Sequence, residues 1–265
     1  MPNFTLNKDG RYSDKRQLKH KKLTIMKRIL FPTDFSEASN NAFVYALKLA
    51  DAIKAELITL HAYELPQLHI GGLPNTLKEV YDSIELENFE NFKDQIPMLR
   101  DIAEQHNLAH VKISNILKHG DLIWTIKKVT KEENIDYVVM GTKGASGLKE
   151  TFLGSNTGSV MTELEAYVIG VPQSSEYNGI QNVVFTTRFR EKDLKALKKV
   201  IELAKLFDAK VHCLYVKTKK TDVNPVIIED WKFLFKDDKV VFHIIEDENV
   251  QQTILKFVDS YKVDL

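Results

Sequence analysis

Two glycine-bearing segments, Met140-Gly141-Thr142-Lys143-Gly144 and Gly154-Ser155-Asn156-Thr157, are separated by nine residues of the chain. The first follows the apolar run 137–140, which is typical of a buried parallel strand. Glycine at a strand end lets the backbone turn sharply and lets a ligand approach closely. Glycine before Ser-Asn-Thr predicts the start of a helix, where free N–H groups and the helix dipole attract phosphate. We therefore expect a phosphate-binding loop at the carboxyl end of a parallel strand, where open α/β sheets bind their ligands.

The two segments differ from the common nucleotide-binding motifs. The chain contains neither G-x-x-x-x-G-K-[ST] nor G-x-G-x-x-G. A surface loop that merely contains glycines remains the alternative if the segment is considered alone.

Composition excludes several classes of protein. The 37 Lys and Arg residues balance the 37 Asp and Glu residues, which argues against a general nucleic-acid binder. No apolar run approaches the roughly 20 residues of a membrane span. The single cysteine, Cys213, excludes an intrachain disulfide, and its apolar surroundings predict a buried strand residue rather than a reactive thiol. These features together are typical of a cytoplasmic protein.

Residues 1–25 carry a surplus of positive charge. They hold seven Lys and Arg residues against Asp9 and Asp14, and they have no apolar core of a secretory signal. We expect a basic disordered tail, with the folded part beginning at Met26, which could be the biological start. The alternative is a basic arm that binds nucleic acid or another acidic partner.

Apolar patterns after Met26 alternate between short strands and amphipathic helices. Strands are expected at 27–31, 57–62, 110–117, 135–140 and 166–171, and helices from Ser36, over 77–106, over 121–132 and from Ser155. Such alternation predicts right-handed crossovers and a parallel sheet.

The chain also contains an internal repeat. Residues 27–62 align without gaps to residues 181–216, an offset of 154. Identical residues occupy both core positions and the strand-to-helix turn: Phe31, Thr33, Phe35, Glu37, Ala42, Leu49, Ala50, Ala55 and Leu60 match Phe185, Thr187, Phe189, Glu191, Ala196, Leu203, Ala204, Ala209 and Leu214. The chain is therefore expected to hold two copies of one α/β unit, joined by a linker at 173–180.

The second copy is incomplete. A strand at 240–245 and a helix at 248–260 are expected, and the sequence stops at residues 263–265, where a fourth strand should begin. No second glycine segment occurs. We expect the resulting gap to be filled by the first copy, by another protomer, or not at all if the chain is truncated.

Three elements together resemble the universal stress protein family in its tandem form. They are the Pro32-Thr33-Asp34-Phe35-Ser36 turn, the His61-Ala62 strand end and the segment 140–157. The resemblance is strong over 26–172 and rests on the repeat and topology over 180–265. It implies an α/β fold with two tandem open parallel-sheet domains, adenine nucleotide α-hydrolase-like or Rossmann-like. It also implies five strands in the order 3-2-1-4-5, with the second domain, 181–265, degenerate and incomplete.

The resemblance also implies ATP as the ligand, with Mg²⁺ or Mn²⁺ bound through its phosphates. In ATP-binding members the first turn contacts the adenosine, the second strand end lies against the base, and the glycine segment binds phosphates and ribose. By resemblance, the residues of this sequence expected to make these contacts are Pro32, Thr33, Asp34, Ala62, Met140, Gly141, Lys143, Gly144, Gly154, Ser155, Asn156 and Thr157.

Some of these residues have simpler interpretations. Asp34 is also suited to bond the backbone of its own turn, Ser155 to cap its helix, and Lys143 to lie solvated in a loop. In the second copy Arg188 replaces Asp34 and Arg190 replaces Ser36, so we expect no ATP there.

Three functions remain open from sequence alone. The first is a nucleotide-dependent stress-response binding protein. The second is a structural or partner-binding member without nucleotide. The third is a weak ATPase or another ATP-using α/β enzyme. No nucleophile with its base is recognisable among the eight scattered histidines, so catalysis is at most slow hydrolysis or autophosphorylation. The resemblance implies that the two domains pair through the strand 166–171, although the second copy lacks its own last strand for this intrachain pairing. A homo-oligomer, as a dimer, is also expected, with no membrane or nucleic-acid partner and an unidentified protein partner.

Overall fold

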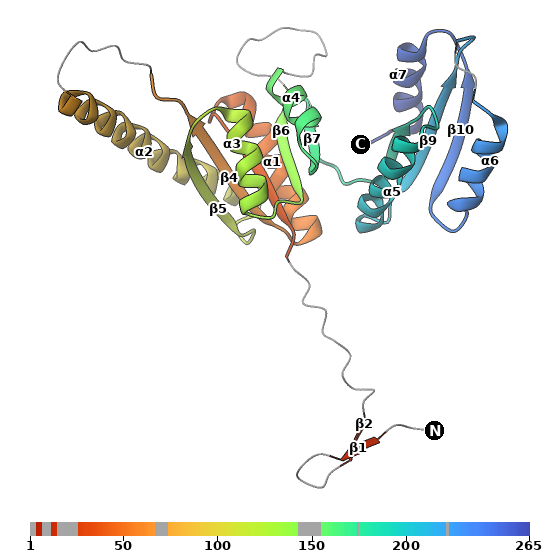
Figure 1. The fold of residues 1–265 in the computed structure, drawn as a ribbon, viewed down its shortest axis with the longest axis horizontal. Coiled ribbons are helices and arrows are strands. Elements are labelled where there is room, and N and C mark those ends of the chain that lie inside the picture. The colour runs from red at the N-terminus through yellow and green to blue at the C-terminus, as the bar shows by residue number, and fades with distance from the viewer. Residues whose placement is uncertain are drawn as a thin grey trace.

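The computed structural model describes residues 4–6, 12–14, 26–66, 74–142, 155–173, 175–220 and 223–265. Two parallel sheets with helices on both faces follow one another along the chain (Figure 1). Near the N-terminus, β1 (Phe4–Leu6) pairs antiparallel with β2 (Tyr12–Asp14). No regular structure was expected in the basic tail, so these six residues differ from that expectation.

The first sheet has five parallel strands in the order β5-β4-β3-β6-β7. They are β3 (Arg28–Pro32), β4 (Glu56–Tyr63), β5 (Ile113–His119), β6 (Tyr137–Gly141) and β7 (Tyr167–Val171). The order 3-2-1-4-5 predicted for this sheet is confirmed. The chain leaves β3 toward β4 on one side and later returns to β6 on the other. The boundary between β3 and β6 is therefore the topological switch point at which such sheets bind ligands.

Helices cover both faces of this sheet because alternate strand residues point to opposite sides. Helices α1 (Glu37–Ile53) and α2 (Pro74–Gln105) pack on the face that carries Phe31, whose ring lies 5.4 Å from that of Phe43. Helices α3 (Leu122–Glu132) and α4 (Ser155–Glu163) cover the face that carries Leu30. Both strand residues are fully buried, so β3 is sealed from water on both faces.

The second sheet has three parallel strands in the order β10-β9-β8. They are β8 (Asn182–Thr186), β9 (Lys210–Lys217) and β10 (Val240–Glu246). Helices α5 (Glu191–Leu206) and α6 (Pro225–Leu234) pack on one face and α7 (Val250–Tyr261) on the other. This confirms a second, incomplete parallel sheet. Helix α6 was not predicted, because exposed apolar residues surround its buried stripe of Ile228 and Trp231 and obscure the helical period. Its start is nevertheless marked by Asn224, whose side chain accepts from the Val226 N–H at 3.0 Å.

The internal repeat is a structural repeat. Strand β8, helix α5 and strand β9 begin 154 residues after β3, α1 and β4. The turns after β3 and β8 also share their backbone: Phe35 has φ of 58° and Phe189 has φ of 56°. In each turn, that phenylalanine N–H donates to the hydroxyl oxygen of the preceding threonine, Thr33 or Thr187, at 3.0 and 2.8 Å. The left-handed conformation therefore belongs to the turn itself rather than to a ligand.

One strand of the first unit begins later than expected, and the long helix before it contains a proline that does not end it. The strand expected at 110–117 is observed at 113–119, because the chain turns after α2, with Asn107 at φ of 59° and Val111 N–H donating to Leu108 O at 3.0 Å. Helix α2 continues through Pro97 without ending there. The apolar pattern identified both elements but placed the strand boundary about three residues early.

The last residues of the chain stand where a fourth strand would begin. Val184 N–H donates to the Leu265 carbonyl at 2.9 Å, and Asp264 N–H donates to the Asn182 carbonyl at 2.9 Å. In the first sheet, Asp136 makes the equivalent bond to the Arg28 carbonyl at 3.0 Å. Val184 and Leu265 line a cavity of 460 Å³ together with β7 of the first copy. Among the described residues, β7 therefore does not take the place of the missing fourth strand.

Two histidines are packed together beneath α7. His212 Nδ1 lies 3.0 Å from His243 Nε2, and His212 Nε2 lies 3.3 Å from Asn182 Oδ1. The rings of Phe257 and Tyr261 pack against both imidazoles. Because an amide oxygen only accepts, His212 donates from Nε2, and in the neutral ring Nδ1 is then the acceptor for His243. Both contacts can therefore be hydrogen bonds while the two rings are neutral.

We predict that the second sheet loses stability as the pH falls below about 6.5, the ordinary pKa of histidine. Burial lowers the pKa of both imidazoles, and nearby His243 and Lys210 lower that of His212 further. The unfolded chain therefore binds protons that the folded chain does not, so stability rises with pH through this window and falls below it.

Fluorescence of Trp231, which is buried in α6, reports on this sheet when Trp124 in α3 is replaced by Phe. The urea midpoint should be lower at pH 5 than at pH 7, and His212→Gln with His243→Phe should reduce the difference. An unchanged midpoint across this range would contradict the prediction.

Candidate functional site

A cavity of 290 Å³ opens at the carboxyl ends of β3, β4 and β6, at the switch point of the first sheet. Its lining comes from the turn after β3, the end of β4, the end of β6 and the first turns of α3 and α4. The residues are Pro32, Thr33, Asp34, Ser36, Ser39, His61, Ala62, Leu122, Met140, Gly141, Ser155, Asn156 and Thr157.

Every predicted site residue that the structure describes lies on this cavity. These are Pro32, Thr33, Asp34, Ala62, Met140, Gly141, Ser155, Asn156 and Thr157. The remaining three, Lys143, Gly144 and Gly154, fall outside the described residues. Four lining residues were not predicted as ligand contacts: Ser36, Ser39, His61 and Leu122.

The turn after β3 is held by its own side chains. Asp34 Oδ1 accepts from the Ser36 N–H at 3.0 Å and from the Ser36 hydroxyl at 2.6 Å. Ser36 in turn caps α1, because its Oγ accepts from the Ser39 N–H at 3.3 Å. These contacts match the simpler interpretation of Asp34 as a turn residue. The carboxylate also lines the cavity and is exposed, so a ligand can reach it.

The opposite wall is built where β6 ends and α4 begins. Thr157 is 2% exposed, and its hydroxyl donates to the Gly141 carbonyl at 2.9 Å. This bond fixes the first turn of α4 against the strand end. Ser155 and Asn156 precede it at the exposed N-terminus of a nine-residue helix, where N–H groups lack helical partners.

His61 contributes an aromatic wall that the sequence did not assign to the site. Its Nδ1 lies 2.8 Å from the Thr33 carbonyl, and its ring centroid lies 5.1 Å from that of Phe35 and 6.3 Å from that of Phe92. Sequence alone favoured a core histidine. Its position at the end of β4, beside the first turn, was the signal for a site residue.

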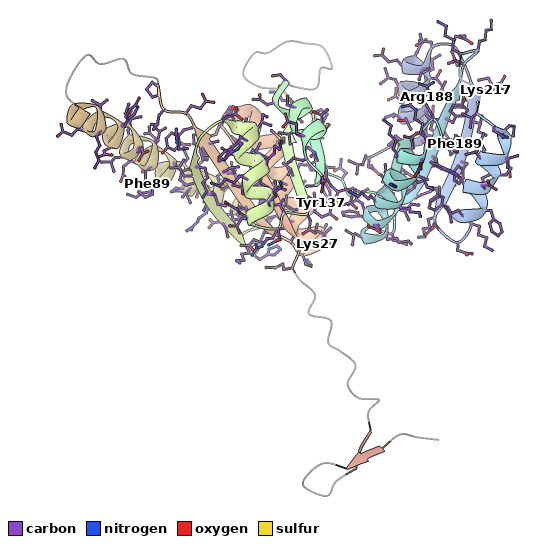
Figure 2. The ribbon with its side chains drawn as sticks, viewed as in Figure 1. Lys27, Phe89, Tyr137, Arg188, Phe189 and Lys217 are labelled. Atoms are coloured by element: carbon purple, nitrogen blue, oxygen red, sulfur yellow. The ribbon has the colours of Figure 1, made fainter. Side chains whose placement is uncertain are left out.

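The equivalent turn of the second copy is filled by a carboxylate of the chain itself. Asp193, which stands where the first copy has Ser39, accepts from the N–H groups of Arg188 and Arg190 at 3.0 and 3.3 Å and from the Thr187 hydroxyl at 3.1 Å. Burial disfavours its charged form, but these bonds, together with the charge of Arg190, outweigh burial and lower its pKa. Arg188 lies at the same end of the sheet as Lys217, the carboxyl end (Figure 2).

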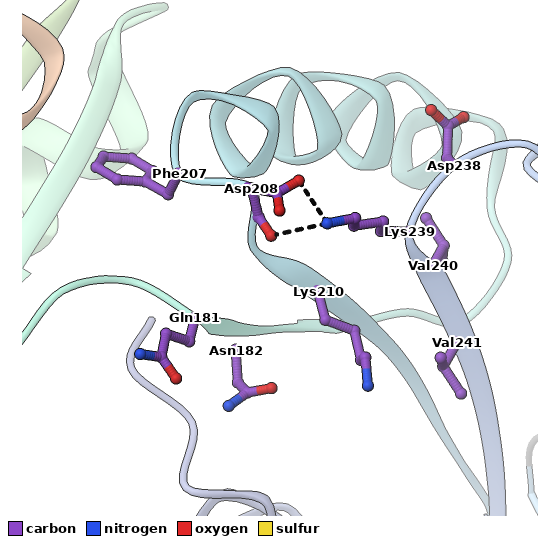
Figure 3. A pocket seen from close by; sticks show the side chains of 9 residues that line it. All are labelled: Gln181, Asn182, Phe207, Asp208, Lys210, Asp238, Lys239, Val240 and Val241. Atoms are coloured by element: carbon purple, nitrogen blue, oxygen red, sulfur yellow. Dashed lines mark hydrogen bonds and ion pairs between the residues drawn. The ribbon is translucent and has the colours of Figure 1, made fainter.

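A larger cavity, of 720 Å³, lies at the amino ends of the three strands of the second sheet (Figure 3). Its rim includes Lys239, which pairs with Asp208, and the exposed Lys210. The smaller cavity is the better candidate site, because it lies at the carboxyl ends and carries the predicted residues.

Burial raises the pKa of the Cys213 thiol to about 12, with a further contribution from Asp193, and the residue is 1% exposed. This confirms Cys213 as a buried strand residue. Within the described residues, no three metal-ligating side chains cluster. None of the helices described is long and apolar enough to cross a membrane.

The sequence profile of the universal stress protein family matches residues 26–172, more than half of the chain and all of the first sheet. The chain belongs to this family. The resemblance inferred from the turn, the strand end and the glycine segment is thereby confirmed.

Three relatives show the extent of the similarity. Universal stress protein MJ0577 of Methanocaldococcus jannaschii is 28% identical over 56% of this chain and 96% of its own length. Universal stress protein YxiE of Bacillus subtilis is 28% identical over 48% of this chain and 86% of its own. The crystal structure of a universal stress protein from Archaeoglobus fulgidus matches 89% of this chain and 82% of its own, with a TM-score of 0.59 and 20% identity. That structure supports the fold across both sheets.

Proposed function

We propose that this universal stress protein binds one ATP in its first domain and acts as a nucleotide-dependent regulatory binding protein. One observation carries the proposal. The turn at Thr33 and Asp34 and the segment around Gly141 and Thr157, over 100 residues apart in sequence, line a single cavity at the switch point. Family resemblance predicted both segments as ATP contacts, and the fold brings them together.

The cavity divides into two chemically different ends. Ala62, Met140 and the turn after β3 offer apolar surface, carbonyl groups and the Asp34 carboxylate, which suit a base and its ribose. Ser155 and Asn156 offer hydroxyl and amide groups at a helix N-terminus, which suits phosphate. We assign Lys143, Gly144 and Gly154 to the phosphate end. Mg²⁺ or Mn²⁺ would be held mainly by the phosphates, because such ions need few protein ligands.

We propose that the second domain does not bind ATP. Asp193 already accepts hydrogen bonds from the turn that a ligand would contact, and its negative charge would repel phosphate. Arg188 replaces the carboxylate of Asp34, and no second glycine segment exists. The boundaries that we propose are 26–172 and 181–265, joined by 173–180.

Binding rather than robust catalysis is supported by the side chains on the cavity. His61 is committed to Thr33 through Nδ1, and the Asp34 carboxylate is committed to Ser36. The His61 bond leaves Nε2 as the basic nitrogen of the neutral ring, but among the described residues no hydrogen bond joins that nitrogen to a nucleophilic side chain. We also propose that the protein forms dimers through β7, the edge strand of the five-stranded sheet.

We predict that Asp34→Ala weakens ATP·Mg²⁺ binding by about tenfold or more, since a hydrogen bond to a charged group contributes about 1.5–3 kcal/mol. Isothermal titration of the full chain measures this. Asp51→Ala is the matched control, because Asp51 is a carboxylate on α1, the helix that follows the Asp34 turn, and it pairs with Lys54 and His110 outside the cavity. Absence of ATP binding by the wild type, or equal affinity in Asp34→Ala, would refute the proposal.

A further inference from the structure

We propose that His61 is a positioning residue that holds the Thr33–Asp34 turn in the conformation that binds nucleotide. The inference rests on the proposed function and deepens it. It is carried by one hydrogen bond, by two ring contacts and by a difference between the two copies of the fold.

The hydrogen bond to Thr33 determines which ring nitrogen of His61 carries a proton. His61 Nδ1 lies 2.8 Å from the Thr33 carbonyl oxygen. A carbonyl oxygen only accepts, so Nδ1 carries the proton and donates. In the neutral ring, Nε2 is then the acceptor. The bond joins the end of β4 directly to the turn whose next residue is Asp34.

Two phenylalanines hold the ring in place. The ring of Phe35, at the left-handed position of the turn, and that of Phe92 in α2 lie 5.1 and 6.3 Å from the imidazole and 6.0 Å from each other, with Phe92 stacked on the imidazole at an interplanar angle of 18°. Phe92 is itself 7% exposed, so the contact is a packed one. The imidazole thus packs against a cluster of two aromatic rings while its Nδ1 bonds the Thr33 carbonyl.

The second copy holds the same turn by another means. The threonine and phenylalanine of the turn are identical in both copies, and the φ angles of the two phenylalanines agree within 2°. The residue equivalent to His61 is Tyr215, and the residue equivalent to Ser39 is Asp193. In that copy the Asp193 carboxylate bonds the turn from the helix side and fills it.

The two arrangements leave different groups open to a ligand. In the first copy Asp34 accepts from the Ser36 N–H and Ser39 Oγ lies 3.2 Å from Thr33 Oγ1, while His61 adds a bond from the strand side, and Asp34 and Ser39 both line the cavity. Asp193 supports the turn by occupying the donors of its backbone. His61 thus allows the turn to be rigid and open at the same time.

Side-chain chemistry gives a sharp test. The amide nitrogen of Asn can replace a donating Nδ1, whereas Gln places its amide farther out, near the position of Nε2, and Ala replaces neither. ATP·Mg²⁺ titration of the full chain should show His61→Asn within about threefold of the wild type. His61→Gln and His61→Ala should each lose tenfold or more, with circular dichroism spectra like that of the wild type. Loss in His61→Asn as large as in His61→Ala, or wild-type affinity in His61→Ala, would overturn the proposal.

A second measurement needs no nucleotide. Long-range ¹H–¹⁵N spectra of the free protein should show His61 protonated on Nδ1, and amide exchange of Phe35 should speed up in His61→Ala but not in His61→Asn. A proton on Nε2, or exchange unchanged in His61→Ala, would overturn the positioning role even if ATP binds. Failure of ATP to bind the wild type, with these spectra as expected, would instead refute the proposed function alone.

Discussion

Ser39→Asp is expected to weaken ATP·Mg²⁺ binding at least tenfold while the protein stays folded and as heat-stable as the wild type. The substitution gives the first copy the carboxylate that fills the turn of the second copy. Because the phenylalanine of each turn has the same left-handed conformation, the new side chain should bond the N–H group of Asp34 and compete with the Asp34 carboxylate for that of Ser36, whereas Asp193 bonds those of Arg188 and Arg190.

The added negative charge at residue 39 should weaken ligand binding but stabilise helix α1. A second negative charge beside Asp34 opposes an anionic ligand. A carboxylate in the first turn of α1 interacts favourably with the helix dipole, by about 0.3–1 kcal/mol. Ser39→Asp should therefore leave the stability of the fold unchanged while it weakens the binding of ATP.

Ser39→Asn is the matched control, because it has nearly the same shape as the aspartate variant without the charge, and its affinity should lie between those of the wild type and Ser39→Asp. Titration calorimetry and thermal unfolding on the same samples separate the two effects. If Ser39→Asp bound ATP with the affinity of the wild type, the two turns would not be equivalent. The main argument that the second domain does not bind ATP would then be lost.

Glu56→Ala is expected to destabilise the first sheet by about 2 kcal/mol. The Glu56 carboxylate is 5% exposed at the start of β4, where Lys112 Nζ lies 2.8 Å and Arg28 Nε 3.4 Å from its oxygens. Ser114 donates to it at 2.7 Å. Removing it takes a partner from Lys112 and from Arg28, but Lys112 is 63% exposed and keeps its water, and Arg28 still pairs with Glu133 at 3.3 Å, so the cost is less than for a fully buried pair.

The stabilisation by Glu56 should also depend on pH. Burial alone would raise its pKa, but the bonds from Lys112 and Ser114 and the charges of Lys112 and Arg28 outweigh burial and lower it. A carboxyl with a lowered pKa stabilises the fold at neutral pH, and this contribution is lost as the pH falls through the folded-state pKa.

Hydrogen exchange of amides in β3 and β4 measures the effect of Glu56→Ala. The matched control is Glu56→Gln, which keeps an acceptor for Ser114 and should cost less than Glu56→Ala at pH 7. Equal protection in Glu56→Ala and the wild type at neutral pH would show that the cluster contributes nothing to stability.

Sequence patterns predicted the strands of the first sheet because their apolar runs are continuous, as buried parallel strands require. The 154-residue offset predicted the register between the two copies to the residue, since identical turn residues fix it. Helix α6 was missed because its exposed apolar residues, such as Val226 and Phe233, obscure the periodic stripe formed by the buried Ile228 and Trp231. The start of β5 was misplaced because Val111 is buried in the turn after α2 and resembles a strand residue.

Some residues of the site could be predicted from sequence and others could not, and the difference has a physical reason. Glycine, serine and threonine near strand ends carry a local signature, so the walls at Thr33 and Thr157 could be identified from sequence. The role of His61 depends on β4 lying beside β3, a contact between distant segments that composition cannot show. The role of Asp193 depends likewise on a turn that folds back on its own helix.

The most direct test of the central claim is a count of bound ATP molecules by native mass spectrometry as ATP·Mg²⁺ is titrated into the full chain. One ATP per chain at saturation, lost in Ser39→Asp, is the result that a single open site in the first domain predicts. Two ATP molecules per chain would contradict the closed second domain, and none would contradict nucleotide binding itself.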